Sequence, residues 1–170
     1  MKTTGVIGAG SWGTALATVL AGKGGSVKIW DIDEKHLRSM EENRENVDYL
    51  PGVPLNENIK IAYTVEEALA DADVVLFSAP AQHFRSALTS ALGHIKDDAL
   101  IINVAKGIEQ KTLLRMSQIA ADHIDMYRYV VLSGPSHAEE VGRRLPTTVA
   151  AASYNIEAAE KVQDLFMTDR

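Results

Sequence analysis

The glycine-rich segment Gly8-Ala9-Gly10-Ser11-Trp12-Gly13 constrains the fold of this chain more than any other feature of its sequence. It follows a short β-prone run that ends at Ile7, and it opens a stretch whose apolar residues recur at helical spacing. At such a strand-to-helix turn, Gly8 permits the tight turn, Gly10 lets a ligand approach the backbone, and Gly13 lets the helix pack close to the strand. Free N–H groups and the positive end of the helix dipole then favour a pyrophosphate. The segment predicts a dinucleotide-binding turn, with a ligand-free glycine turn as the alternative.

Strand-like and helix-like segments alternate along the whole chain. Strands are predicted at residues 5–7, 26–30, 59–63, 73–77, 100–103, 129–132 and 147–152. Helices are predicted at residues 11–23, 34–44, 81–92, 112–123, 136–142 and 156–167, and Thr64 with Glu67 forms a capping box for another. Two of the strands, 74–77 and 100–102, are apolar throughout, as in strands buried on both faces. This alternation predicts an α/β fold of the Rossmann type, a doubly wound, mainly parallel sheet with helices on both faces.

An aspartate, Asp31, follows the second predicted strand directly after Trp30 and lies 18 residues beyond Gly13. This is close to the offset of about 20 residues at which an acidic side chain binds the adenosine ribose. A carboxylate there accepts hydrogen bonds from both ribose hydroxyls and repels a 2′-phosphate. The following residues, Ile32 and Asp33, include no arginine, so the pattern favours NAD over NADP. A solvated aspartate at a strand end is the alternative, and Asp33 is interpreted as a helix N-cap without a ligand role.

Three further segments follow predicted strands and therefore belong to the carboxyl edge of the sheet, where doubly wound sheets bind their ligands. The small residues of the segment 78–81 (SAPA) permit close backbone approach. Lys106, followed by Gly107, suits a cation that binds a phosphate, a carbonyl oxygen or the cofactor. Ser136 and its neighbouring N–H groups, at the start of a predicted helix, form an anion-binding arrangement. An ordinary turn, a solvated lysine and helix capping by Ser136 are the respective alternatives.

Composition narrows the class of function. The formal net charge of −6 argues against nucleic-acid or anionic-membrane binding, because both require clustered positive charge. The absence of cysteine excludes disulfides, thiolate nucleophiles and thiolate metal sites, and no two histidines stand four residues apart, so no metal site is expected. Apolar runs are far shorter than the ~20 residues that span a membrane. The N-terminal region, broken by glycines, does not resemble a signal peptide, so we expect a cytoplasmic protein.

Taken together, the motifs resemble the N-terminal domain of bacterial NAD(P)-dependent glycerol-3-phosphate dehydrogenase. The matching stretches, in family order, are GAGSWGTALA from Gly8, the strand ending at Trp30, the loop Tyr49-Leu50-Pro51, NVAKGIE from Asn103 and LSGPSHAEEVGRRLPTTVA from Leu132. The family reduces dihydroxyacetone phosphate to sn-glycerol 3-phosphate, a precursor of phospholipids. The resemblance implies the same small-molecule substrate and cofactor for the protein to which this chain belongs.

The resemblance also implies roles for individual residues. It implies cofactor contacts at Ser11, Trp12, Lys106 and Ala138, beside the glycines and Asp31. It implies substrate contacts at Lys106, Gly134 and Ser136. Lys106 is the one candidate for a catalytic residue in this half of the enzyme, with an electrostatic and binding role.

Three features depart from the family pattern. Many members have an arginine after the second strand where this chain has Asp31-Ile32, which disfavours NADP. His137 stands where a phenylalanine is frequent. Family members continue into an all-helical domain that carries a second lysine, the acid/base, whereas this sequence ends at Arg170. We therefore expect residues 1–170 to form one NAD-binding domain that has little dehydrogenase activity alone. The sequence leaves the oligomeric state open, a homodimer of the full-length protein included.

Two rival functions fit parts of the sequence. The first is a related two-domain dehydrogenase that acts on another hydroxy acid, which the segment SGPSHAEE from Ser133 argues against. The second is a nucleotide-binding module that senses NADH and regulates a partner without catalysis, for which the sequence offers no DNA-binding segment or basic patch.

Overall fold

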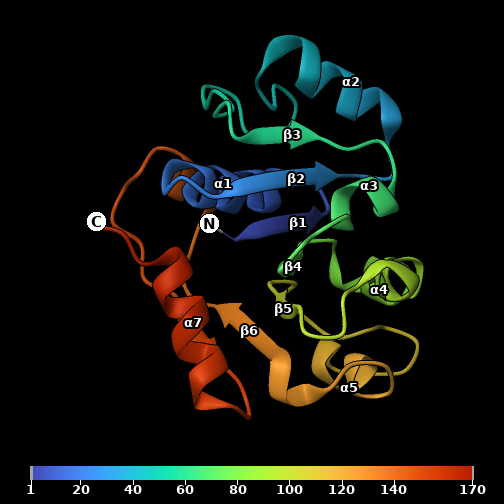
Figure 1. Cartoon of the computed structure of the whole chain (residues 1–170). Coiled ribbons are helices and arrows are strands. Elements are labelled where there is room, and N and C mark those ends of the chain that lie inside the picture. The colour runs from blue at the N-terminus through green and yellow to red at the C-terminus, as the bar shows by residue number, and fades with distance from the viewer. Residues whose placement is uncertain (1, 170) are drawn as a thin grey trace.

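The computed structural model describes residues 2–169, which form a seven-stranded sheet with the order β3-β2-β1-β4-β5-β6-β7 (Figure 1). Neighbouring strands are parallel except for β7, which is antiparallel to β6. The strands are β1 (Thr3–Ile7), β2 (Ser26–Trp30), β3 (Ile59–Ile61), β4 (Val74–Phe77), β5 (Leu100–Asn103), β6 (Tyr129–Ser133) and β7 (Ala150–Ala152). The strand order reverses between β1 and β4, which is the topological switch point of a doubly wound sheet. The predicted Rossmann-type fold is confirmed.

Helices cover both faces of this sheet. They are α1 (Ser11–Gly22), α2 (Glu34–Asn43), α3 (Val65–Leu69), α4 (Phe84–Ala91), α5 (Met116–Ala121), α6 (Ala138–Gly142) and α7 (Ile156–Phe166). In Figure 1, α7 lies on one side of the sheet and α3, α4 and α5 lie on the other. Three short 3₁₀ turns, Ala81–His83, Leu92–His94 and Met126–Arg128, complete the described helical segments.

Alternating side chains of the central strands build two separate cores. Val6 and Val74 belong to the cluster that packs under α1, α2 and α7. Their neighbours Ile7 and Val75 belong to the cluster that packs under α3, α4 and α5. Since successive strand residues point to opposite faces, a strand covered on both sides must be apolar at every position. The uninterrupted apolar runs in the sequence are explained by this double burial.

Several predicted boundaries are wrong for identifiable reasons. The helix predicted at 112–123 begins only at Met116, because Leu113 has a φ of 58° and the Thr112 hydroxyl donates to the Glu109 carboxylate. The segment 81–92 divides into a 3₁₀ turn, α4 and the start of a second 3₁₀ turn. The last strand is shorter than 147–152, because only Ala150–Ala152 pairs with β6.

Two helix starts follow the predicted capping chemistry. The Asp33 carboxylate accepts hydrogen bonds from the N–H groups of Lys35 and His36, which confirms it as the N-cap of α2. Thr64 caps α3 by accepting from Glu67 N–H at 3.1 Å. The returning Glu67 carboxylate accepts from the N–H of Tyr63, one residue earlier than a capping box requires. The start of α3 is therefore stabilised by hydrogen bonds to the backbone N–H groups of Tyr63 and Glu67.

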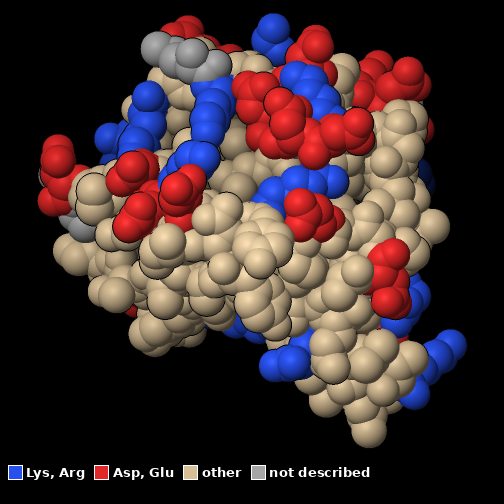
Figure 2. Space-filling model, turned by 60° about the horizontal axis from the view of Figure 1, so that its bottom comes forward, with Lys and Arg blue, Asp and Glu red and all other residues tan. Residues whose placement is uncertain are grey.

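Charge is mixed over the surface. Figure 2 shows Lys and Arg side chains interspersed with Asp and Glu on one face, above a broad area of uncharged residues. Among residues 2–169, no helix has the length and apolar character that a membrane span requires. The same residues include no group of three or more His, Asp or Glu side chains arranged to hold a metal ion.

Candidate functional site

Five loops meet at the carboxyl edge of the sheet, around the switch point. They follow β1, β2, β4, β5 and β6, and they begin at Gly8, Asp31, Ser78, Val104 and Gly134. Parallel strands end at the same edge, so segments far apart in the sequence are brought together there. The candidate site is therefore assembled from loops that the sequence already marked.

The three glycines of the glycine-rich loop, residues 8–13, occupy three different environments. Gly8 has a φ of 110°, and a Cβ there would lie 2.8 Å from the backbone nitrogen of Ala79. A Cβ on Gly13 would lie 2.1 Å from the carbonyl oxygen of Gly8. A Cβ on Gly10 would meet no atom within 4 Å. These environments match the predicted roles, a tight turn, close helix packing and an open approach for a ligand.

The backbone of this loop presents unused hydrogen-bond donors. Helix α1 begins at Ser11, and its N-cap Gly10 has no side chain to cap the first turn. Within residues 2–169, the N–H groups of Gly10, Ser11, Trp12 and Gly13 donate to no protein acceptor. Four such donors at the positive end of a 12-residue helix form an anion site of the kind that holds a pyrophosphate.

Asp31 is half-buried and contacts the glycine-rich loop directly. Its Oδ2 accepts a hydrogen bond from Ala9 N–H at 2.7 Å, and its Oδ1 accepts from Asp33 N–H at 3.2 Å. Each carboxylate oxygen has a second lone pair, so both can still accept from a ribose. The following residue, Ile32, is 88% exposed and offers no charge to a 2′-phosphate. The Asp31 carboxylate can therefore still accept hydrogen bonds from the ribose hydroxyls, as the sequence predicts.

Lys106 joins two loops of the edge. Its Nζ donates to the carbonyl oxygen of Gly134 at 2.9 Å and lies 3.5 Å from both the carbonyl oxygen and the Oγ of Ser136. The ammonium also lies 5.9 Å from the centroid of the Trp12 ring, within range of a cation–π interaction. We call these four residues the Lys106 cluster. Four predicted site residues are thus in one place, and the exposed Lys106 side chain contacts the loop that follows β6.

Ser136 and Ala138 stand differently from the sequence prediction. Helix α6 begins at Ala138, so Ser136 lies before the helix and its capping role is wrong. The side chain of Ala138 is 8% exposed and packs with Ala15, Leu50 and Val53. Its methyl group therefore packs against the protein.

A partly buried ion pair supports the loop that carries Lys106, and the sequence prediction assigned it no role. Arg85 on α4 donates through Nε and Nη2 to the Glu109 carboxylate at 2.9 and 2.8 Å, and the Thr112 hydroxyl donates to the same carboxylate. These hydrogen bonds lower the pKa of Glu109 to about 2. Gln82 also bonds the backbone of this loop, at Ile108 O and Gln110 N–H. Glu109 belongs to the sequence motif at 103–109, but its partner lies 24 residues away in the chain.

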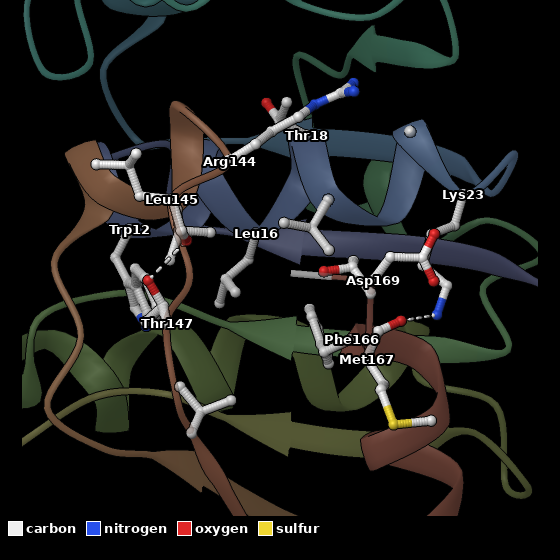
Figure 3. Close-up of a pocket in the computed structure, with 15 residues that line it drawn as sticks. Trp12, Leu16, Thr18, Lys23, Arg144, Leu145, Thr147, Phe166, Met167 and Asp169 are labelled. Atoms are coloured by element: carbon white, nitrogen blue, oxygen red, sulfur yellow. Dashed lines mark hydrogen bonds between the residues drawn. The ribbon is translucent and has the colours of Figure 1, made fainter.

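A groove of about 480 Å³ runs along α1, between α6 and the end of α7. Figure 3 shows Trp12 and Thr147 at one end of the groove and Lys23 and Met167 at the other. Lys23 Nζ closes that far end by donating to the carbonyl oxygen of Met167 at 2.6 Å. The groove meets the glycine-rich loop only at Trp12, because Gly10, Ser11 and Gly13 are not among its lining residues.

Comparison with known proteins decides the family. A family model described as the N-terminus of NAD-dependent glycerol-3-phosphate dehydrogenase matches residues 3–159. The chain belongs to this family. The glycerol-3-phosphate dehydrogenase (NAD(P)+) of Pelotomaculum thermopropionicum is 48% identical over 167 residues, which make up 96% of this chain and 48% of that protein. The enzyme of the same name from Bacillus velezensis is 47% identical over 170 residues, or 98% and 49% of the two chains.

A solved structure agrees with this assignment. The crystal structure of glycerol-3-phosphate dehydrogenase from Coxiella burnetii is 31% identical and superimposes with a TM-score of 0.92, covering 99% of this chain and 52% of that one. The resemblance seen in the sequence is confirmed. The chain spans about half the length of the curated relatives it matches.

Proposed function

We propose that this chain is the cofactor-binding part of a glycerol-3-phosphate dehydrogenase that reduces dihydroxyacetone phosphate to sn-glycerol 3-phosphate with NADH. The observation that carries the proposal is the row of unused N–H groups from Gly10 to Gly13 at the start of α1. This arrangement binds a pyrophosphate without any cationic side chain. Membership of the dehydrogenase family supports a nicotinamide dinucleotide as the ligand that contains this pyrophosphate.

The order of the strands supports one direction for the cofactor. Asp31 follows β2 and would accept from the hydroxyls of the adenosine ribose. The Lys106 cluster follows β5 and β6, on the opposite side of β1, so the nicotinamide would lie toward it. Ser11 and Trp12, at the start of α1 between these two ends, would contact the middle of the dinucleotide.

The chemistry of this half depends on charge and position. When bound, NADH supplies the hydride that reduces the ketone carbon. The Lys106 ammonium would stabilise the negative charge that develops on the substrate oxygen, and such a preorganised donor acts most strongly where water is excluded. The family resemblance supports Gly134 and Ser136 as contacts of the phosphate end of the substrate, and the Lys106 ammonium that contacts both residues would supply positive charge beside it. The acid that protonates the oxygen would come from the part of the longer relatives that this chain does not cover.

The wider setting is also a proposal. Residues 1–170 would act as one NAD-binding domain, and the remainder of a protein of the relatives' length would complete the substrate pocket. The product would serve phospholipid synthesis. A cytoplasmic location fits a substrate and a cofactor that are both metabolites of that compartment.

Calorimetric titration of this chain with NADH and with NADPH tests the proposal. We expect NADH to bind about tenfold or more tightly than NADPH, because the Asp31 carboxylate repels a 2′-phosphate. The variant Asp31→Asn keeps the shape and removes the charge, so the ratio should shrink. Failure of the chain to bind either nucleotide would refute the proposed function. Equal binding of both would leave the cofactor site standing and remove Asp31 as the selector.

A further inference from the structure

One peptide group of the glycine-rich loop is held by side chains from separate parts of the chain. The carbonyl oxygen of Ala9 accepts from His36 Nε2 at 3.0 Å, from Asn46 Nδ2 at 2.8 Å and from Thr14 Oγ1 at 3.3 Å. The N–H of Ala9 donates to Asp31 Oδ2 at 2.7 Å. We call this set of bonds the Ala9 network. It fixes both polar groups of a residue that stands between two glycines.

The network is buried and its members are themselves held. Ala9, Thr14 and Asn46 are fully buried, and His36 is 6% exposed, so water cannot replace a lost donor at little cost. Asn46 uses its amide group completely, because Nδ2 also donates to Thr14 Oγ1 at 2.8 Å and Oδ1 accepts from Tyr49 N–H at 3.0 Å. The His36 ring packs edge-on against Tyr49, with ring centroids 4.9 Å apart.

Two further contacts define how His36 acts. Its Nε2 must carry a proton, because Ala9 O can only accept. Its Nδ1 faces the Asp48 carboxylate at 3.4 Å, and no other charged side chain contacts the ring among the described residues. Asp48 and Tyr49 therefore fix the orientation of the His36 ring and hence of its Nε2–H donor.

The direction of the Gly10 N–H follows from this arrangement. In a planar trans peptide, the carbonyl of Ala9 and the N–H of Gly10 point in opposite directions. Donors that draw the carbonyl into the protein therefore turn the N–H away from them, and the Gly10 N–H donates to no protein acceptor among the described residues. We propose that His36 and Asn46 are positioning residues for pyrophosphate binding, which act by holding the Ala9 carbonyl so that Gly10 N–H faces the ligand.

The inference rests on the proposed function, and it adds residues that lie outside the glycine motif. Neither side chain reaches the open side of the loop, since both are buried beneath it. Their effect should therefore be specific to ligands that carry a pyrophosphate. A residue that merely stabilised the fold would affect every ligand of the domain equally.

The test uses the 170-residue chain, labelled with ¹⁵N, and titrates it with ADP and with adenosine. Asn46→Asp keeps the side-chain shape and sets an oxygen against Ala9 O, so we expect ADP affinity to fall about tenfold or more. Adenosine affinity should stay within about twofold, because that ligand makes no pyrophosphate contact. The amide resonance of Gly10 should shift in the free variant and respond less to ADP. Asn43→Asp, an exposed change of the same charge on α2, is the matched control and should bind ADP normally.

A second pair of variants keeps the inference testable if Asn46→Asp does not fold. His36→Gln retains a donor near the position of Nε2 and should bind ADP like the wild-type chain. His36→Leu removes that donor and should weaken ADP selectively. Equal ADP affinity in both variants, or equal loss of ADP and adenosine in Asn46→Asp, overturns the inference and leaves the proposed function intact. Absence of ADP and NADH binding by the wild-type chain would instead refute the proposed function, and the inference with it.

Discussion

The glycine-rich loop and the Lys106 cluster lie at the same edge of one sheet, but they are built in opposite ways. The loop is six consecutive residues whose ligand-facing groups are backbone N–H donors. The cluster joins Trp12, Lys106 and the segment 134–136, which follow three different strands, through a side-chain ammonium. The loop depends on glycines that lack a Cβ atom, and the cluster depends on a lysine side chain that contacts residues from other loops.

This difference predicts how each region fails. The loop should be broken by adding a single carbon atom at a crowded glycine, because there the backbone already fills the space. The function of the Lys106 cluster should instead be lost when the positive charge of its ammonium is removed.

Alanine variants at Gly13 and Gly10 should differ in their effects: the first should lower stability, and the second should lower cofactor affinity. In Gly13→Ala, the new Cβ would lie 2.1 Å from Gly8 O, so we expect a loss of about 3 kcal/mol or more in the free energy of unfolding. In Gly10→Ala, no atom lies within 4 Å and φ is −68°, so stability should change by less than about 0.5 kcal/mol. NADH affinity should nevertheless fall about tenfold, because the methyl group occupies the ligand side. Urea denaturation and calorimetry measure the two effects, and equal stability of the two variants would contradict the steric account.

Lys106→Met should show the reverse pattern. The ammonium lies at an exposed edge, so stability should stay within about 0.5 kcal/mol of the wild-type value. In a full-length enzyme that carries this domain, kcat should fall about a hundredfold or more, as for the loss of a donor that stabilises transition-state charge. Lys111→Met, in the exposed part of the same loop, is the control and should retain normal kcat. Normal turnover in Lys106→Met would remove this lysine from the proposed mechanism.

Glu109→Gln should expose the support beneath the Lys106 loop through its pH dependence. The pKa of Glu109 is lowered to about 2 in the folded chain, from an ordinary value of 4.5. Its contribution to stability is therefore fully present above about pH 4.5 and is lost as the pH falls from there toward 2.

The wild-type chain should accordingly be more stable than Glu109→Gln near neutral pH, and the difference should shrink in acid. Chemical denaturation at a series of pH values measures this difference. Glu57→Gln, at an exposed glutamate, should show no such convergence. A stability difference that is independent of pH would show that the carboxylate charge is not what holds the loop.

Asp33→Ala should give the smallest effect and sharpen the assignment of its neighbour Asp31. Loss of the N-cap of α2 should cost about 1 kcal/mol of stability. NADH affinity should remain within about twofold, because Asp33 accepts only from the first turn of its own helix. A large loss of NADH affinity in this variant would show that Asp33, and not Asp31, contacts the ribose.

Features that depend on local sterics and on burial could be predicted from the amino-acid sequence. The apolar runs of β4 and β5 and the Asp33 cap were readable because each depends on residues within one turn or strand, and the three glycines were readable from their spacing at a strand-to-helix turn. They were enough to predict the Rossmann-type sheet and the edge at which the site lies.

Contacts between side chains from distant segments could not be predicted from the sequence. His36 and Asn46 carry no pattern that marks them as partners of Ala9, and Arg85 carries none that marks it as a partner of Glu109. The late start of α5 and the release of Ser136 from helix capping likewise depend on contacts made across the fold. The physical reason is that a hydrogen bond between distant segments depends on how the strands are ordered, whereas propensity and capping depend on neighbours in the chain.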